Sequence, residues 1–249
     1  PQSFPEHSDI DLYATQTPAR DVGGDLYDYF VHKGRLVFCI GDVSGKGVPA
    51  ALLMAVMRAM FRSEARRACS AAEIVGTMNR NLSEEYAGDD FVTMFVGILD
   101  LASGHLDYCN AGHEAPLLSG QPLPVLPNLP VGALADWTYE GQQEQLQSGD
   151  MLFLSTDGLS EAKNAADEQF GRKHVLQLAN DHRSLAAKPL IELMMSEVSS
   201  HTGDALQSDD ITMLAVRWLG NGLTLKPSMD DIGRLAPFIT SAANRAGNL

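Results

Sequence analysis

The stretch "LVFCIGDVSGKGVPAALLMAVM", residues 36–57, decides the fold because it joins an apolar strand to a helix through a glycine-rich turn. The run 36–40 clusters β-forming residues between glycines, which predicts a strand. Pro49 suits the first turn of a helix, and the apolar residues after it recur at helical spacing. We therefore expect a sharp strand-to-helix turn at "GDVSGKG", residues 41–47.

The helix after this turn is expected to run from Val48 to about Arg67. Apolar residues occupy two neighbouring faces of it, so we expect the helix to be nearly buried. These residues are Leu52, Val56 and Met60 on one face and Leu53, Met57 and Phe61 on the other. A second helix is predicted from Ala71 to Glu85, with Ser70 as a possible N-terminal cap.

The glycines and Lys46 raise the question of a phosphate-binding loop. A P-loop has a longer spacer before its Gly-Lys and a hydroxyl residue directly after it, and residues 41–47 have neither. The dinucleotide pattern GxGxxG is missing as well. What remains is Asp42 at the end of an apolar strand. A buried aspartate is costly unless it is paired, hydrogen-bonded or bound to a metal.

Aspartates recur where predicted core strands meet turns. Asp25 follows two glycines, Asp157 ends the run "MLFLST", and Asp209 and Asp210 precede "ITMLAV". If these strand ends converge, they form an all-oxygen site suited to hard divalent cations such as Mg²⁺ or Mn²⁺. Zinc is disfavoured, because no histidine or cysteine pair has ligand spacing. The alternative is that these aspartates only cap turns.

The order of predicted elements favours an α+β protein over regular βαβ winding. Strands are expected first, then two helices, then a hairpin and further strands, then two helices and a last strand. The expected strands are 9–17, 24–32, 34–43, 91–100, 105–113, 136–146, 150–158 and 209–218, and the later helices are 172–181 and 188–201. A proline-rich segment, 116–130, interrupts the pattern.

Composition limits the classes of partner. The 249 residues carry a net charge of −14, which argues against nucleic acid or an anionic membrane surface as a partner. Three cysteines without CxxC spacing predict buried thiols in a reducing compartment. No apolar run is long enough for a membrane span, so we expect a cytoplasmic protein. The chain opens without a methionine, and we expect it to be part of a longer protein.

Five motifs in order closely resemble the metal-dependent type 2C serine/threonine phosphatases, specifically the bacterial SpoIIE/RsbU-like branch. The resemblance covers roughly residues 3–219. Its motifs are "PARDVGGDLYD" (18–28), "GDVSGKGVPAALLM" (41–54), "NAGHEAPLL" (110–118), "STDGLSEAKN" (155–164) and "SDDITML" (208–214). The family implies a β-sandwich of two antiparallel sheets flanked by helices, with a two-metal site at one end.

The resemblance also implies roles for the aspartates. Asp42 resembles the carboxylate that bridges both metals, and Asp157 and Asp209 resemble the partners that hold one of them. Asp25 resembles the ligand of the other metal, together with the Val43 carbonyl. Asp42 and Asp157 are thus the catalytic residues that the resemblance implies, while Asp210 is expected to support the site from behind the ligands.

The implied chemistry is attack of metal-activated water on a phosphoserine or phosphothreonine, without a phosphoenzyme. Two cations about 3.5–4 Å apart supply hydroxide and neutralise the transferring oxygens. Ser44 stands where a larger branch has a histidine, so the group that protonates the leaving alkoxide is unassigned. His113 stands where many relatives have an aspartate linked to a third metal, and a structural role is the alternative. Arg20 is either a phosphate contact or a solvated side chain.

The resemblance further implies partners and regulation. The expected substrate is a phosphorylated anti-sigma-factor antagonist of a bacterial partner-switching pathway, and the expected regulator is an upstream sensory or receiver domain acting through the helices at 48–84. A dimer of the parent protein is a further expectation. Lys46 is expected to be peripheral, while Gly45 and Gly47 allow the sharp turn.

Residues 220–249 weakly resemble the start of an anti-sigma-factor-type kinase domain. The alternative is a C-terminal helix that packs on the phosphatase domain, 1–219. Two rival functions stay open for the whole chain: a catalytically inactive phosphatase-fold module that binds a partner protein, and a carboxylate-rich hydrolase of small phosphoesters.

Overall fold

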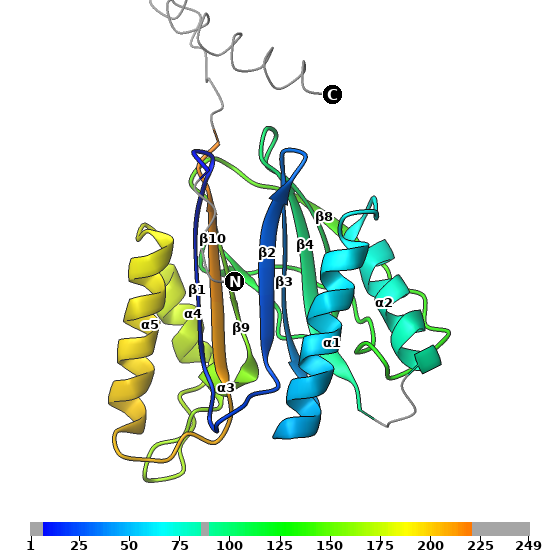
Figure 1. Ribbon diagram of the computed structural model, residues 1–249. Coiled ribbons are helices and arrows are strands. Elements are labelled where there is room, and N and C mark those ends of the chain that lie inside the picture. Colours follow the sequence, from blue (N-terminus) through cyan, green and yellow to red (C-terminus); the bar gives the residue numbers. More distant parts are fainter. Residues whose placement is uncertain (1–6, 86–89, 221–249) are drawn as a thin grey trace, which may run out of the picture.

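Two antiparallel sheets stack face to face, and helices cover both outer faces (Figure 1). The computed structural model describes residues 7–85 and 90–220. The β1 sheet has the order β1 (Ile10–Thr17), β10 (Ile211–Trp218), β9 (Met151–Ser155), β6 (Leu117–Leu118) and β7 (Gln121–Pro122). The β3 sheet has the order β2 (Leu26–His32), β3 (Arg35–Val43), β4 (Val92–Asp100), β5 (His105–Ala111) and β8 (Gln142–Gln145).

The helices form the outer layers. On the β3 sheet lie α1 (Val48–Glu64) and α2 (Ala71–Glu85), and on the β1 sheet lie α4 (Arg172–Asp181) and α5 (Ala187–Thr202). The short α3 (Asp157–Ser160) follows β9 directly. None of the helices in the described part of the chain combines the length and apolarity that a bilayer crossing requires.

Three apolar clusters separate these four layers, which explains why the central strands are apolar on both faces. In β3, Leu36, Phe38 and Ile40 point between the sheets, whereas Val37 and Cys39 point toward α1 and α2. A strand that is buried on both faces has apolar residues without interruption, and residues 36–40 form such a run. Burial on both faces therefore fixes β3 at the centre of its sheet.

This architecture confirms the expected fold class, a β-sandwich of two antiparallel sheets flanked by helices. Two details differ from the sequence expectation. The predicted strand 136–146 is reduced to β8, and the proline-rich segment contributes the two short strands β6 and β7. The predicted domain boundary at residue 219 stays a prediction, because residues 221–249 lie outside the described residues.

The expectation that α1 is nearly buried was wrong. Leu53, Met57 and Phe61 are buried against the β3 sheet, but Leu52 is 64% exposed and Val56 is 46% exposed. Helical spacing shows which residues share a face, but not whether a second face is covered. Helix α1 therefore carries an apolar face without cover among the described residues.

Burial of all three cysteines was also too broad an expectation. Cys39 and Cys109 are buried free thiols, whereas Cys69 is exposed between α1 and α2. Burial raises the pKa of Cys109 to about 12, with repulsion from Asp107 adding to the effect. The two buried cysteines thus act as small apolar residues of the core.

A buried carboxylate fixes α1 on its sheet. Asp28, on β2, is fully buried and accepts hydrogen bonds from Arg62 at 2.5 and 2.7 Å and from Arg58 at 3.3 Å. Burial by itself raises the pKa of Asp28, but the hydrogen bond and charge of Arg62 outweigh it, so the net shift is downward. The charged pair therefore ties one side of α1 to β2.

Candidate metal-binding active site

The four aspartates predicted as ligands lie at one end of the sandwich and come from both sheets. Asp25 immediately precedes β2, and Asp42 is the penultimate residue of β3, so both belong to the β3 sheet. Asp157 begins α3 directly after β9, and Asp209 lies just before β10, so both belong to the β1 sheet. We call these four residues the carboxylate cluster.

Their mutual repulsion shows that these side chains are close to one another. Burial, followed by repulsion from Asp157 and Asp209, raises the pKa of Asp42 to about 7. Burial also raises the pKa of Asp25 to about 8, and repulsion from Asp42 adds to it. The pKa of Asp157 is raised by burial, by Glu161 and by Asp209. The cluster therefore concentrates more negative charge than its own surroundings neutralise.

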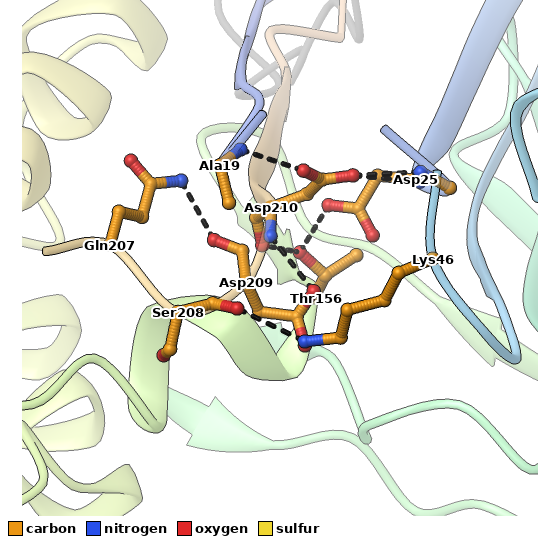
Figure 2. Close-up of polar contacts among 9 residues, drawn as sticks. Ala19, Asp25, Lys46, Thr156, Gln207, Ser208, Asp209 and Asp210 are labelled. Carbon is orange, nitrogen blue, oxygen red and sulfur yellow. Dashed lines mark hydrogen bonds and ion pairs between the residues drawn. The ribbon is translucent and has the colours of Figure 1, made fainter. Parts of the chain in front are cut away.

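Asp210 has a different role from its neighbour Asp209: it binds backbone N–H groups. Its carboxylate accepts hydrogen bonds from the backbone N–H groups of Ala19 and Gly24, both at 2.8 Å (Figure 2), and its negative charge helps to raise the pKa of Asp25 and Asp42. A longer contact of 3.4 Å reaches the N–H of Asp25. Asp210 thus fixes the segment before β2 and, through it, the position of Asp25. This geometry fits the expectation that Asp210 supports the site from behind the ligands.

Two glycines make room for this arrangement. A Cβ atom on Gly23 would lie 2.0 Å from Oδ2 of Asp210, and one on Gly158 would lie 1.9 Å from the Asp210 carbonyl oxygen. Because real Cβ atoms do not approach other atoms so closely, both positions require glycine. The glycines in "VGGD" and "STDGL" are therefore explained by the close approach of Asp210.

Thr156 was not singled out by sequence reasoning, yet it holds Asp25. The Thr156 hydroxyl donates a hydrogen bond to Oδ2 of Asp25 at 2.8 Å and accepts one from the Thr212 N–H at 3.0 Å. Thr156 is fully buried between β9 and β10. The only sequence signal for it was its place immediately before Asp157.

Lys46 is not peripheral, contrary to expectation. Its Nζ lies 2.8 Å from Oδ2 of Asp209 and donates a hydrogen bond to the Ser208 carbonyl at 3.0 Å (Figure 2). Lys46 follows β3, whereas Ser208 and Asp209 precede β10, so this ion pair crosses from one sheet to the other. Lys46 therefore occupies part of the coordinating capacity of a predicted ligand.

No three acidic, histidine or cysteine side chains within residues 7–85 and 90–220 are already arranged as a metal cage. Two of the predicted ligands have other partners instead: Asp209 pairs with Lys46, and Asp25 accepts a hydrogen bond from Thr156. The donor chemistry nevertheless fits a hard cation, because every candidate side chain offers carboxylate oxygens and the cluster has surplus negative charge.

The turn after β3 has the geometry expected of it. Gly45 and Gly47 have φ values of 94° and 78°, in the region that favours glycine. Ser44 is fixed to the chain before β4: its hydroxyl accepts a hydrogen bond from the Phe91 N–H at 2.8 Å, and its own N–H donates to the Phe91 carbonyl at 2.9 Å. The buried Val43 lies beside Gly24, whose added Cβ would be 3.2 Å from the Val43 carbonyl oxygen.

His113 and Arg20 occupy different environments. His113 is buried, its Nδ1 lies 3.1 Å from the Thr93 hydroxyl, and burial lowers its pKa to about 4. Thr93 in turn pairs with Asp42 across β3 and β4, so His113 lies behind the cluster. Arg20 is exposed and lines a shallow pocket with Asp42, Lys46 and residues 208–210.

Comparison with known proteins identifies the family. Residues 32–219 match the family described as Stage II sporulation protein E (SpoIIE). The chain belongs to this family, whose members with solved structures include type 2C phosphatase domains. Family and fold therefore place the chain in the class of type 2C phosphatase domains.

Particular relatives agree with this class. The chain is 30% identical to Protein IcfG of Synechocystis over 87% of its length and 25% identical to the phosphoserine phosphatase RsbU of Bacillus subtilis over 86%. It spans 39% of the first relative and 64% of the second.

Two solved structures are similar. The SiaA-PP2C domain of Pseudomonas aeruginosa superimposes with a TM-score of 0.75 at 25% identity, covering 83% of this chain and 85% of that one. The RsbU and RsbW domains of Rv1364c from Mycobacterium tuberculosis give a TM-score of 0.72 at 26% identity. The match covers 95% of this chain and 69% of that one.

Proposed function

We propose that this chain is a Mn²⁺- or Mg²⁺-dependent phosphatase that removes phosphate from serine or threonine of a regulatory phosphoprotein. The observation that carries the proposal is the convergence of carboxylates from two sheets, with the pKa of Asp42 raised to about 7 and that of Asp25 to about 8. Such surplus charge is stabilised when divalent cations replace the protons. A cluster that only capped turns would not need carboxylates from both sheets.

We propose the metal ligands residue by residue, by the positions of the family motifs. Asp42 would contact both ions, Asp25 and the Val43 carbonyl would hold one, and Asp157 and Asp209 would hold the other. When bound, the cations supply Lewis acidity that activates water and neutralises the transferring phosphate. In this arrangement Asp42 and Asp157 are the catalytic carboxylates.

Other residues of the chain have supporting tasks in this proposal. Asp210 and Thr156 position Asp25 through the hydrogen bonds described above. Lys46 lines the same pocket, and if Asp209 held a cation, the ammonium group of Lys46 would be available to neutralise a phosphate oxygen there. Arg20, on the rim of the same pocket, is a second candidate for this contact.

The proposed substrate is a phosphorylated anti-sigma-factor antagonist of a partner-switching pathway. Support comes from the relatives RsbU and RsbP of Bacillus subtilis, both named phosphoserine phosphatases, and from the solved RsbU and RsbW domains. We propose a cytoplasmic site of action, in keeping with three free cysteines. Residues 220–249 are proposed to begin a kinase domain or, alternatively, to form a C-terminal helix.

Regulation is proposed to act through α1. This helix starts directly after the Gly45–Gly47 turn, and its exposed Val48, Leu52 and Val56 offer an apolar face to an upstream sensory or receiver domain or to a second copy of the parent protein. We expect this segment alone to have weak or deregulated activity. Turnover equal to that of the full-length protein under every signalling condition would contradict this.

One observation favours the alternative of a catalytically inactive binding module. Lys46 pairs with Asp209, a predicted ligand, in the way a residue that replaces a metal would. The ion pair is half-exposed on both sides, and exposed pairs of this kind contribute little stability. Competition from divalent cations is therefore expected to displace Lys46.

Hydrolysis of an aryl phosphate tests the proposal. We expect turnover that requires Mn²⁺ or Mg²⁺ and that falls by several orders of magnitude in Asp157→Asn, while the variant keeps its fold by circular dichroism. Turnover in excess EDTA, or an unchanged rate in Asp157→Asn, would remove the mechanism. Comparing a phosphoprotein with free phosphoserine separates the proposal from a small-phosphoester hydrolase.

A further inference from the structure

A groove runs from the carboxylate cluster along the end of α5. Its floor consists of buried apolar side chains, Ala162, Val198 and Ile211, and its rim carries Met195 and Leu206. The groove has a volume of about 240 Å³ and includes Ser208 and Asp209, which also line the shallow pocket over the cluster. The two depressions therefore lie next to each other and share Ser208 and Asp209 as lining residues.

Leu206 is the unusual residue of this groove. It is 94% exposed, more than any other large apolar residue in the described part of the chain. Its neighbours are nevertheless fixed: the Gln207 side chain donates hydrogen bonds to the carbonyls of Thr17 at 2.8 Å and Asp209 at 2.7 Å, and Lys46 binds the Ser208 carbonyl (Figure 2). The apolar side chain is thus presented from an anchored loop.

We propose that this groove holds an apolar side chain of the phosphoprotein substrate, located close in sequence to the phosphorylated residue. The inference rests on the proposed function, because the groove begins where the phosphorylated residue must enter. A substrate chain whose phosphate lies over the carboxylate cluster and that leaves the shallow pocket past Asp209 places its next residues over the groove.

The size and the apolar lining of the groove match a single apolar side chain. Pockets for cofactors and similar ligands have about 300–1,000 Å³, whereas a cavity of about 150 Å³ holds one benzene ring. A groove of about 240 Å³ therefore suits one leucine, methionine or phenylalanine side chain. Binding of such a side chain is favourable because apolar surface of the groove and of the side chain is removed from water.

Synthetic phosphoserine peptides test the proposal. A leucine is scanned from four residues before to four residues after the phosphoserine in an otherwise alanine and lysine sequence, and kcat/KM is measured with Mn²⁺. We expect a leucine at one or two positions on one side to raise kcat/KM about tenfold, because placing or removing an apolar group in a pocket changes rates by about 10–200-fold.

The variant Leu206→Ser removes the rim without disturbing the core, and Met195→Ala shortens the opposite wall. Both should reduce the leucine preference to less than threefold and leave hydrolysis of an aryl phosphate unchanged. Leu134→Ser is the matched control, because Leu134 is 51% exposed and does not line the groove. It should keep the full preference.

The outcomes separate the two proposals. Metal-dependent hydrolysis without preference for leucine at any position overturns the groove and leaves the phosphatase intact. A leucine preference that persists in both Leu206→Ser and Met195→Ala also overturns the groove and leaves the phosphatase intact. Absence of hydrolysis of every probe overturns the proposed function and, with it, the groove.

Discussion

Lys46 Nζ lies 2.8 Å from Oδ2 of Asp209, and the two residues belong to different sheets of the sandwich. The side chains are 51% and 42% exposed, so water screens the attraction between them. In the proposed mechanism a cation replaces Lys46 at Asp209. This competition can be measured.

Replacing Lys46 with methionine should therefore lower the Mn²⁺ concentration needed for half-maximal hydrolysis of an aryl phosphate. Exposed ion pairs contribute about 0.2–1 kcal/mol, so we expect a change of about fivefold or less. A metal titration of turnover measures it, with Lys173→Met as a control for general loss of positive charge. A raised KM without a change in metal affinity would instead assign Lys46 to the phosphate.

Gly23→Ala should lower both stability and activity. The new Cβ would lie 2.0 Å from Oδ2 of Asp210, so the hydrogen bonds that Asp210 accepts from the segment before β2 cannot persist. We expect a loss of about 1–3 kcal/mol, as for other overpacked sites. Gly76→Ala in α2 is the matched control: its nearest neighbour is 3.7 Å away, so it should gain about 0.5–1 kcal/mol. Urea unfolding compares them, and equal effects would contradict the role of Asp210.

The metal-free protein should lose stability with rising pH through Asp25. The folded pKa of Asp25, about 8, is above its ordinary value of 3.8, so the folded state holds a proton that the unfolded state has lost across this window. Its contribution is therefore most favourable at low pH and declines as pH rises toward 8.

Asp25→Asn should remove this decline. In EDTA, the Tm of the variant relative to the native chain is expected to rise between pH 5 and pH 8.5, by some degrees for a domain of this size. Asp136→Asn, at an exposed position away from the cluster, should show no such trend. Adding Mn²⁺ should stabilise the native chain more at pH 8.5 than at pH 5. Parallel pH profiles for native chain and variant would contradict the burial of a charge at Asp25.

The pair between Asp28 and Arg62 should respond unequally to the loss of either partner. Arg62→Met leaves the fully buried Asp28 with the longer contact to Arg58 and the hydrogen bond from the Tyr29 N–H, so the cost should approach the loss of about 3–5 kcal/mol seen when a buried charge loses its partner. Asp28→Asn leaves arginines that can reach water, so about 1–3 kcal/mol is expected.

Chemical unfolding at two pH values measures this difference. The net pKa of Asp28 is lowered, so its contribution is present above the ordinary aspartate range and is lost as pH falls through the folded pKa. The cost of Arg62→Met should therefore be larger at pH 7 than at a pH below the ordinary aspartate pKa of 3.8. Equal costs for the two substitutions at pH 7 would contradict this account.

Apolar patterning predicted most of the strands, and the family resemblance implied that they form a sandwich of two antiparallel sheets. Residues 36–40 are apolar without interruption, as in a strand covered on both sides, and β3 occupies that position. The aspartates at the strand ends were predicted to converge, and the raised pKa of Asp42 shows that Asp157 and Asp209 lie near it. Their coordination of metal stays a prediction.

The misses concern contacts between residues far apart in sequence. Lys46 and Asp209 are separated by 163 positions, and nothing in the turn 41–47 indicates that pairing. The segment 136–141 is not a strand because α2 holds the chain just before it: Asn79 donates hydrogen bonds to the carbonyls of Leu134 and Ala135. Neither interaction leaves a local pattern that periodicity can detect.

The division of the carboxylate cluster between two sheets links catalysis to the interior of the protein. Asp25 and Asp42 are attached to one layer and Asp157 and Asp209 to the other, so the apolar side chains between the layers, together with the polar contacts that cross between the sheets, set their separation. A cavity or an oversized side chain at Phe38 or Leu154 would thus alter the spacing of the proposed ligands without touching them. In this molecule the packing of the core is part of the catalytic geometry, and enzymes with the same acidic residues can differ in rate through their interiors alone.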